Sequence, residues 1–323
     1  MKAAYYEVNG AAADVLTVGE VETPEPGPGE VRIRVATSGV NPSDVKTRAG
    51  TVRKIAFDRV IPQSDGAGTI DKVGDGVSPS RVGERVWTWN AQWKRPFGTA
   101  AEYITLPEAQ AVKLPDSASF EVGACLGIPA MTAVHAVSLA GALPGANILV
   151  SGGAGAVANY AIQFAKARGA TVLTTISSPE KAELARKAGA DIAINYKSED
   201  VGERVKAATG GAGVDAVIEM DLSANAGLIP AVIKPKGKVV IYGTGPEATI
   251  PSAFCLVNSI TLQWFLVYEL DDAERAAAVT EINEMLAAGR LVHNIGPEFG
   301  LDDMIKAHEA MEAAVVGKII VRT

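Results

Sequence analysis

The chain has 323 residues, of which 48% are hydrophobic, and a formal net charge of −7 at neutral pH. This length is typical of two domains, and the acidic balance disfavours nucleic acid as a main partner because it repels phosphate backbones. No apolar run approaches the roughly 18 residues that span a bilayer, and Glu7 comes too early for a secretory segment, so we expect a cytoplasmic protein without a membrane partner. Cys125 and Cys255 lie in apolar stretches and predict buried free thiols; two cysteines cannot form a four-thiolate zinc site.

The first 125 residues are rich in strand and turn signals. Residues 31–35 alternate apolar and charged side chains, as a half-buried strand does, and they follow a segment of prolines and glycines. Residues 68–73 and 84–89 are further strand candidates. Glycine and proline separate these strands closely, which predicts a compact, barrel-like domain.

The pattern changes after Pro129, where apolar runs alternate with helical patterns. Such alternation predicts β-α-β units stacked on a parallel sheet. The expected strands are residues 148–150, 171–176, 191–195, 215–219, 238–242 and 260–267. The expected helices are residues 156–168, 179–187, 198–208 and 224–233. The tail adds helices at residues 273–288 and 304–312 and a strand at 318–322.

The most informative stretch is SGGAGAVA at residues 151–158, between an expected strand and an expected helix. Small residues in such a turn let the backbone approach a pyrophosphate, whose charge the amides at the start of the helix then hold. Ala158 occupies the last small position of the motif. Because the strand and the helix are both present, the sequence predicts a dinucleotide site.

The end of the second strand bears on which dinucleotide is bound. A site for NAD usually carries Asp or Glu there to hold the ribose 2′-hydroxyl. This chain has Ser177 and Ser178 instead, and Lys181 follows one helical turn later. These residues favour NADPH, whose 2′-phosphate needs donors and a cation. Ser177 or Ser178 can equally serve as a helix cap before Pro179.

At this point the chain resembles the medium-chain dehydrogenase/reductase superfamily, and within it the zinc-free quinone oxidoreductases of the zeta-crystallin type. The likeness covers essentially the whole chain. It rests on several motifs in order, namely GVNPSD at 39–44, SDGAG at 64–68, GERV at 83–86, GTAAEY at 98–103, GIPAMTA at 127–133, the glycine turn, and IEM at 218–220.

The resemblance implies an α/β fold with a GroES-like, β-rich catalytic domain and a doubly wound Rossmann domain. The catalytic domain would span residues 1–125, completed by 268–323; the Rossmann domain would span 126–267, with the active site in the cleft and a homodimer joined along its sheet. Zinc-dependent relatives carry a cysteine ligand where this chain has Asn41 and a histidine ligand within the segment 64–66. We therefore expect no metal.

The same resemblance implies roles for individual residues. Asn41, Asp44 and Thr132 would belong to the active site, with Asn41, Lys46 and Thr132 close to the nicotinamide half of NADPH. The remaining expected cofactor contacts are Gly152, Gly155, Ala156 and Val157 for the pyrophosphate, Ser177, Ser178, Lys181 and Tyr196 for the 2′-phosphate, Tyr242, Gly243, Thr244 and Gly245 for the ribose, and Trp264, Phe265 and Leu266 for the ring. Asn41 and Asp44 also suit the turn around Pro42 on chemistry alone.

Three functions remain open from the sequence. The first is NADPH-dependent, zinc-independent reduction of quinones or similar conjugated carbonyl compounds. The second is reduction of a carbon–carbon double bond in an enone, alkenal or enoyl thioester, although the tyrosine of enoyl-thioester reductases is Val52 here. The third is a non-catalytic, NADPH-binding structural or RNA-binding role of the crystallin kind. The sequence does not identify the physiological acceptor or the proton donor.

Overall fold

The computed structural model describes all 323 residues, which form two units. Unit 1 comprises Met1–Ile128 and Asn283–Thr323, and unit 2 comprises Pro129–Ile282. From the sequence we expected the chain to return to the catalytic domain at residue 268, whereas in the structure residues 268–282 still belong to unit 2. Tyr268 is buried there, and Glu281 pairs with Arg168 at 2.5 Å.

Unit 2 is built on a six-stranded parallel sheet. Its strands are β8 (Asn147–Val150), β9 (Thr171–Ile176), β10 (Ile192–Asn195), β11 (Val214–Glu219), β12 (Ile233–Ile241) and β13 (Thr261–Trp264). Their order is β10-β9-β8-β11-β12-β13, so that the first strand along the chain lies in the middle. This is the Rossmann order 3-2-1-4-5-6, and it confirms the expected doubly wound sheet. The order reverses between β8 and β11, where such sheets bind their ligands.

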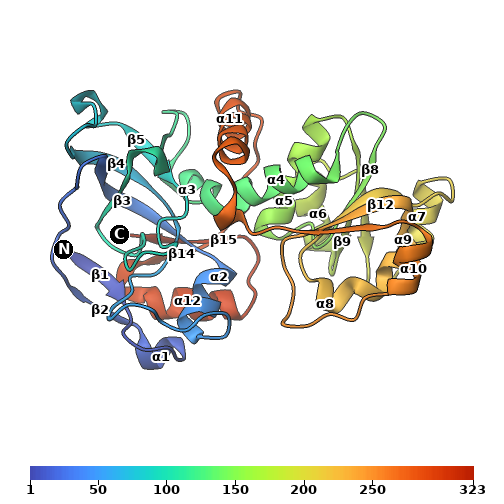
Figure 1. Cartoon of the computed structure of the whole chain (residues 1–323), viewed down its shortest axis with the longest axis horizontal. Helices are drawn as coiled ribbons and strands as arrows, with labels where there is room; N and C mark the ends of the chain where they lie inside the picture. The colour runs from blue at the N-terminus through green and yellow to red at the C-terminus, as the bar shows by residue number, and fades with distance from the viewer. The chain divides into compact units, whose positions relative to one another are not determined.

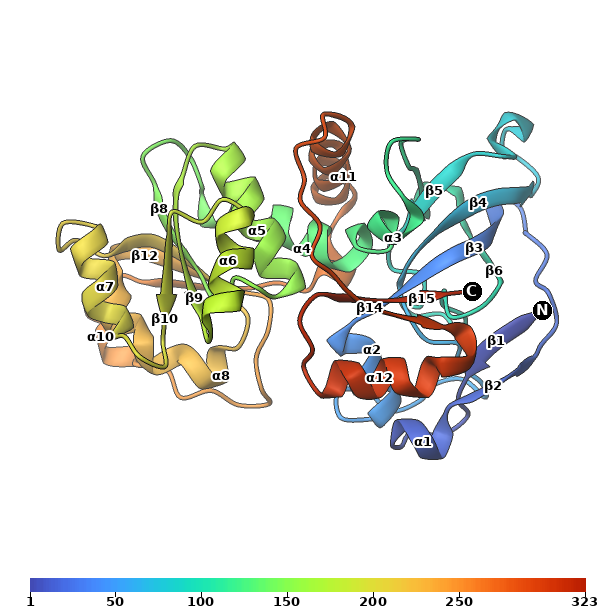
Figure 2. The ribbon, with the colours of Figure 1, turned by 180° about the vertical axis from the view of Figure 1, so that it is seen from behind.

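The periodicity predicted most helices of unit 2 but not those at residues 131–140 and 252–257. The helices of this unit are packed around its strands (Figure 2). They are α4 (Met131–Ala140), α5 (Ala156–Ala167), α6 (Pro179–Lys187), α7 (Val201–Ala208), α8 (Leu222–Asn225), α9 (Ile229–Val232), α10 (Ser252–Val257) and most of α11 (Asp272–Ala287). The single helix expected over residues 224–233 is wrong, because η4 (Ala226–Leu228) separates α8 from α9. The strand expected over 260–267 ends at Trp264, and η5 (Val267–Glu269) follows it.

Unit 1 is a β-rich unit with one seven-stranded sheet and a two-stranded sheet. The strands are β1 (Lys2–Tyr5), β2 (Thr17–Glu20), β3 (Glu30–Val40), β4 (Asp65–Val73), β5 (Arg85–Thr88), β6 (Tyr103–Pro107), β7 (Ala111–Lys113), β14 (Ile295–Gly300) and β15 (Lys318–Arg322). Val31, Ile33 and Val35, the apolar positions of the alternating segment, are all buried. The tail completes this unit because β15 pairs antiparallel with the last residues of β3.

Short helices close unit 1 around this sheet. They are α1 (Ala12–Val15), α2 (Pro42–Ala49), α3 (Phe120–Gly123), the π-helical turn η3 (Leu126–Ala130) and α12 (Met304–Glu312), with 3-10 turns at η1 (Pro79–Arg81), η2 (Glu108–Gln110) and η6 (Leu301–Asp303). Helix α12 lies beside α2 (Figure 1) and contacts β15. Both cysteines are buried and neither forms a disulfide, as expected. None of the helices combines the length and hydropathy that crossing a bilayer requires.

Candidate active site

The glycine turn after β8 packs tightly against its neighbours in unit 2. Gly152 has a φ of +68°, and a Cβ there would lie 2.4 Å from Met220 Sδ. A Cβ on Gly153 would lie 2.3 Å from Thr174 Oγ1. The turn is also fixed by bonds to β9, since Thr175 accepts the amides of Gly152 and Gly153 at 3.0 Å each. Glycine is therefore required here by close approach of the backbone.

The turn leads to the start of α5, which has no side-chain cap. Gly155 is the N-cap residue and has no side chain to offer. By contrast, α6, α7 and α8 are capped by Ser178, Asp200 and Asp221. The first amides of α5, those of Ala156 and Val157 among them, therefore point out of the helix without an acceptor from a cap. Together with the helix dipole, they form a site that fits a phosphate group.

The end of β9 carries hydroxyls and a cation. The Ser178 hydroxyl accepts the amide of Lys181 at 3.3 Å, so Ser178 does serve as the helix cap. Lys181 forms no ion pair. Tyr196 is exposed directly beyond β10, and its amide donates to the carbonyl of Ile176 at 3.2 Å, which brings it beside the end of β9. The carboxylate in the first turn of α6, Glu180, is exposed, and hydrogen bonding to Ser178 lowers its pKa.

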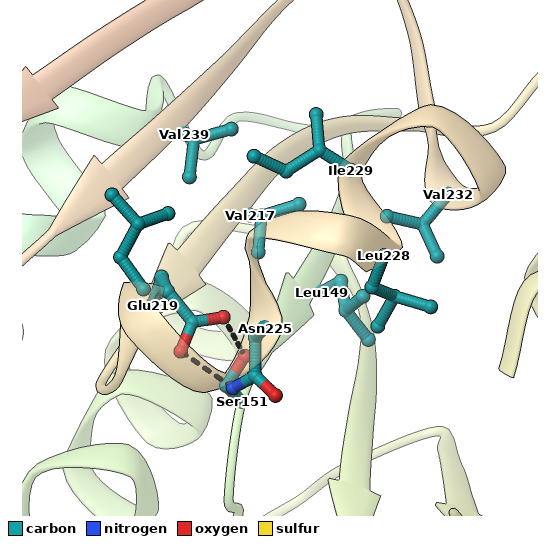
Figure 3. Close-up of a pocket in the computed structure, with 10 residues that line it drawn as sticks. Leu149, Ser151, Val217, Glu219, Asn225, Leu228, Ile229, Val232 and Val239 are labelled. Carbon is teal, nitrogen blue, oxygen red and sulfur yellow. Dashed lines mark hydrogen bonds between the residues drawn. The ribbon is translucent and has the colours of Figure 1, made fainter. Parts of the chain in front are cut away.

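Glu219 lies buried at the end of β11, where the strand order reverses (Figure 3). It accepts hydrogen bonds from the Ser151 hydroxyl (2.6 Å), the Asp221 amide (2.7 Å) and the Asn225 side chain (2.8 Å). These bonds hold the loops after β8 and β11 together. The cavity beside them has a volume of about 10 Å³, the size of one water molecule, and is no substrate site. Its lining is Leu149, Ser151, Val217, Glu219, Leu222, Asn225, Leu228, Ile229, Val232 and Val239.

The segment after β12 is fixed to the loop after β11. Gly243 accepts the amide of Leu222 at 3.2 Å, and the amide of Gly245 donates to the Ser223 hydroxyl at 3.0 Å. Thr244 is exposed between them. Burial, and then the charge of Glu219, raises the pKa of Tyr242, which therefore remains a phenol at neutral pH.

The end of β13 comes close to helix α4. The ring of Phe265 packs edge-on against His135 of α4, with the ring centroids 4.8 Å apart. Thr132 lies one helical turn before His135 and is buried. Trp264 and Leu266, on either side of Phe265, are about half exposed. Of the residues that the sequence assigned to the nicotinamide half, unit 2 therefore carries Thr132 on α4 and residues 264–266 at the end of β13, with Phe265 packed against α4.

Asn41, Asp44 and Lys46 lie in unit 1, with Asn41 and Asp44 at the start of α2 and Lys46 in its last turn. Asn41 and Asp44 are buried and form a capping box, in which the Asn41 amide donates to Asp44 at 2.8 Å. Lys46 is exposed. Burial raises the pKa of the Asp44 carboxyl to about 7, although the charge of Lys318 opposes the shift.

Sequence reasoning missed the partner of Asn41, which is Lys318. The Lys318 ammonium donates to Asn41 Oδ1 at 2.6 Å and to Asp65 Oδ2 at 2.5 Å, and Asn41 Nδ2 donates to the same carboxylate at 2.9 Å. Asp65 also accepts the amide of Ile128 at 2.6 Å. The side chains of Lys318 and Asp65 are only 2% and 0% exposed.

The contacts of this cluster test whether a zinc ion would fit at the place where zinc-dependent relatives bind one. Asn41 and Asp65 turn their oxygens toward an ammonium, which already supplies the positive charge. The structure contains no group of three or more His, Cys, Asp or Glu side chains that could hold a metal ion. The donor set at Asn41 and Asp65 therefore does not fit zinc.

Comparison with known proteins gives the same architecture. The family model described as "Alcohol dehydrogenase GroES-like domain" matches residues 27–116, and the model described as "Zinc-binding dehydrogenase" matches residues 156–284. A quinone oxidoreductase of Rattus norvegicus is 30% identical over 304 residues, which are 93% of this chain and 91% of that one. The chain belongs to the quinone oxidoreductase family of the medium-chain dehydrogenases/reductases.

Another relative in the comparison is a 2-haloacrylate reductase of a Burkholderia species, 32% identical over 229 residues, 69% of this chain and 68% of that one. Among solved structures, the quinone oxidoreductase of Escherichia coli complexed with NADPH aligns over 100% of both chains with a TM-score of 0.89 and 25% identity. A mycobacterial protein complexed with NADPH aligns with a TM-score of 0.89 and 28% sequence identity. An NAD-dependent alcohol dehydrogenase aligns with a TM-score of 0.92 and 28% identity, and both alignments cover 100% of each chain. This quinone oxidoreductase family member therefore shares its whole fold with pyridine-nucleotide enzymes.

Two functional features escaped the sequence reasoning. Glu219 was recognised only as part of a family motif, although a carboxylate at the end of a buried strand is itself a signal of a fixed polar network. Lys318 opens the apolar run KIIV, and a lysine there suggests a buried partner. The identity of that partner, in a loop more than 250 residues earlier, carries no local signal.

Proposed function

We propose that the protein is an NADPH-dependent, zinc-independent quinone oxidoreductase that passes hydride to quinones or similar conjugated carbonyl compounds. The observation that carries the proposal is the start of α5, which has no side-chain cap and leaves its first amides for a phosphate. The end of β9 nearby offers hydroxyls and Lys181, and the strand itself carries no acid that would bind the ribose of NAD. The names of its relatives and the NADPH complexes of its structural neighbours support the same function.

The residues of unit 2 would hold NADPH by its phosphates. The backbone at Gly152 and Gly155 and the amides of Ala156 and Val157 would bind the pyrophosphate, with Ser177, Ser178, Lys181 and Tyr196 around the 2′-phosphate. Residues 242–245, Thr132 and residues 264–266 would orient the nicotinamide half. Bound NADPH supplies the hydride.

The residues of unit 1 would serve the acceptor side. Lys318 and Asp65 fix the Asn41 side chain, so that no rotation is needed when an acceptor arrives. Asp44, which titrates near neutral pH, can hold or release a proton beside Asn41. Neither role requires zinc, because the positive charge at this place belongs to Lys318.

A second candidate is reduction of an activated carbon–carbon double bond. The 2-haloacrylate reductase among the relatives favours it. Val52, in the place of the tyrosine of enoyl-thioester reductases, weighs against the thioester version. A third possibility is the crystallin-like role, in which NADPH binds without turnover.

The three candidates separate in one steady-state assay that follows loss of NADPH absorbance. We expect turnover with 1,2- and 1,4-quinones to exceed turnover with an alkenal or a crotonyl thioester. Faster reduction of the alkenal or thioester would favour the second function. NADPH binding with no turnover of any of these compounds would favour the third.

Lys181→Ala tests the cofactor assignment. We expect the Kd for NADPH to rise about tenfold while the Kd for NADH changes little, since only NADPH carries the 2′-phosphate that the ammonium would meet. Calorimetry with both nucleotides measures the difference. An equal loss for both would mean that Lys181 does not contact the phosphate.

We further propose that the protein works in the cytoplasm as a homodimer joined along the unit 2 sheet. Strand β13 is one of the two outer strands of that sheet, with β10 at the other edge, and its outer side is unpaired. Leu256 and Val257, just before this strand, are 82% and 81% exposed. An open strand edge with exposed apolar side chains suits a second copy of the same chain.

A further inference from the structure

Two loops of unit 1 concentrate positive charge in an acidic chain. Residues 45–57 contain Lys46, Arg48, Arg53 and Lys54 and no Asp or Glu. Residues 86–101 contain Lys94 and Arg95 and likewise no acid. The whole chain carries a net charge of −7, so six cations without one acid are a local exception.

The two loops lie side by side. The Arg53 guanidinium stacks 4.2 Å from the centre of the Trp93 ring. Farther along, Ile61 donates its amide to the carbonyl of Pro96 at 2.9 Å and accepts the amide of Gly98 at 2.7 Å. Lys94 lies 5.5 Å from the centre of the same Trp93 ring, so Arg53 and Lys94 share one surface.

Some of these six cations have a carboxylate partner within the chain, and others have none. Arg48 pairs with Glu312, and Arg95 lies 3.6 Å from Glu30. Arg53 and Lys54 are exposed and form no ion pair. These two cations are available to an anion from outside the chain.

Apolar side chains surround the two cations. Val52, Phe57 and Phe97 are 56%, 36% and 43% exposed, although each is large and hydrophobic. We call Val52, Arg53, Lys54, Phe57, Trp93 and Phe97 the loop patch. Its chemistry suits a molecule that is flat and apolar at one end and negatively charged at the other.

The loop patch follows the end of helix α2, whose start carries the unit 1 groups of the proposed active site. Helix α2 begins at Asn41 and Asp44, and the patch begins two residues after its C-cap, Gly50. Hydrogen bonds join this segment to α2. The carbonyl of Lys46 accepts the amide and the hydroxyl of Thr51 at 3.1 Å each, and Arg53 Nη2 donates to Thr47 Oγ1 at 3.5 Å.

We propose that the loop patch selects acceptors that carry an anionic group, a carboxylate or sulfonate attached to the conjugated system that takes the hydride. Arg53 and Lys54 bind the anion, and Trp93 holds the guanidinium of Arg53 in place for it. The inference rests on the proposed function and names the class of acceptor for the same site.

Two quinones of equal ring structure test this. The probes are 1,2-naphthoquinone and its 4-sulfonate, reduced by the full-length protein with saturating NADPH at low and high salt. We expect kcat/KM to be higher for the sulfonate at low salt, and the advantage to shrink as salt screens the charges. The ratio of the two kcat/KM values is the readout.

Single substitutions test whether the preference for the sulfonate depends on the loop patch. Arg53→Gln and Lys54→Gln should each lower the ratio about fivefold to tenfold, while Arg53→Lys should retain most of it. Lys113→Gln removes the same charge from an exposed site on β7 and should leave the ratio unchanged.

Three results would overturn the inference. The first is equal kcat/KM for the two quinones in the unaltered protein. The second is a loss of the ratio in Lys113→Gln as large as in Arg53→Gln, because the preference would then come from the overall surface charge. A rise in the KM for NADPH in Arg53→Gln would assign the patch to the cofactor. Failure to reduce the neutral quinone would instead count against the proposed function itself.

Discussion

The buried ammonium of Lys318 joins three segments of unit 1 that are far apart in the sequence. A charge removed from water this completely is stable only when paired and hydrogen-bonded, and Asp65 and Asn41 meet both conditions. Removing one partner leaves the other charge unpaired. The cluster therefore holds the starts of α2, β4 and β15 in one arrangement.

We expect Lys318→Met to lower the free energy of unfolding by ~3–5 kcal/mol, the range for breaking a buried ion pair. Urea titration measures it. The double variant Lys318→Met with Asp65→Asn should lose less than the single one, because the uncompensated carboxylate is then gone. A single-variant loss below about 1 kcal/mol would show that water reaches the cluster.

His308 predicts a dependence of stability on pH. It is fully buried on α12, neither ring nitrogen has a partner, and burial, then the charge of Arg48, lowers its pKa from 6.5 to about 3. Between these values the unfolded chain binds a proton that the folded chain does not, so this group makes stability fall as the pH falls from 6.5 to 3.

In His308→Leu this contribution disappears. The difference in unfolding free energy between variant and parent should grow by about 1.4 kcal/mol per pH unit below pH 6.5, in favour of the variant. Denaturant titrations of both proteins at matched pH cancel the contribution of Asp44, whose raised pKa acts in the opposite direction. A constant difference across this range would mean that His308 is already charged in the folded protein.

At the scale of elements, the glycine turn and α5 were predictable because their signals are local. We expect Gly153→Ala to weaken NADPH binding at least tenfold, since the new methyl group would displace the turn from Thr174 and with it the amides at the start of α5. Gly227→Ala is the matched control, because nothing lies within 4 Å of its added Cβ. Equal binding by both variants would mean that the turn can shift without loss.

Other elements escaped the local signals for identifiable reasons. The continuous helix expected over residues 224–233 was wrong because Pro230 lacks the amide that would extend it from the preceding turn, and it instead starts α9. Strands β1, β2, β7 and β14 show neither a clear alternation nor a continuous apolar run; β14, for example, reads IGPEFG, with two glycines and a proline. The proposed nucleotide-binding groups follow from the order of strands and turns, whereas the Lys318 cluster depends on pairing between distant segments, which no window of sequence contains.

For the whole molecule, the proposed association through β13 can be tested in solution. We expect Leu256→Glu with Val257→Glu to shift the protein from dimer to monomer, because two charges would then lie at the proposed interface. Analytical ultracentrifugation over a range of protein concentrations measures the change. Leu143→Glu, at another exposed apolar position of unit 2, should leave the dimer intact. An unaltered protein that is monomeric throughout would refute the arrangement.

The pairing of β15 with β3 also affects how the chain folds as it is synthesised. Unit 2 is complete once Ile282 has left the ribosome, but residues 37–40 of β3 have no partner on that side until Lys318–Arg322 emerge. A nascent or prematurely released chain therefore carries a finished nucleotide-binding unit beside a β-unit with an unprotected strand edge. That edge is a template for intermolecular pairing, so incomplete translation products should be prone to aggregation.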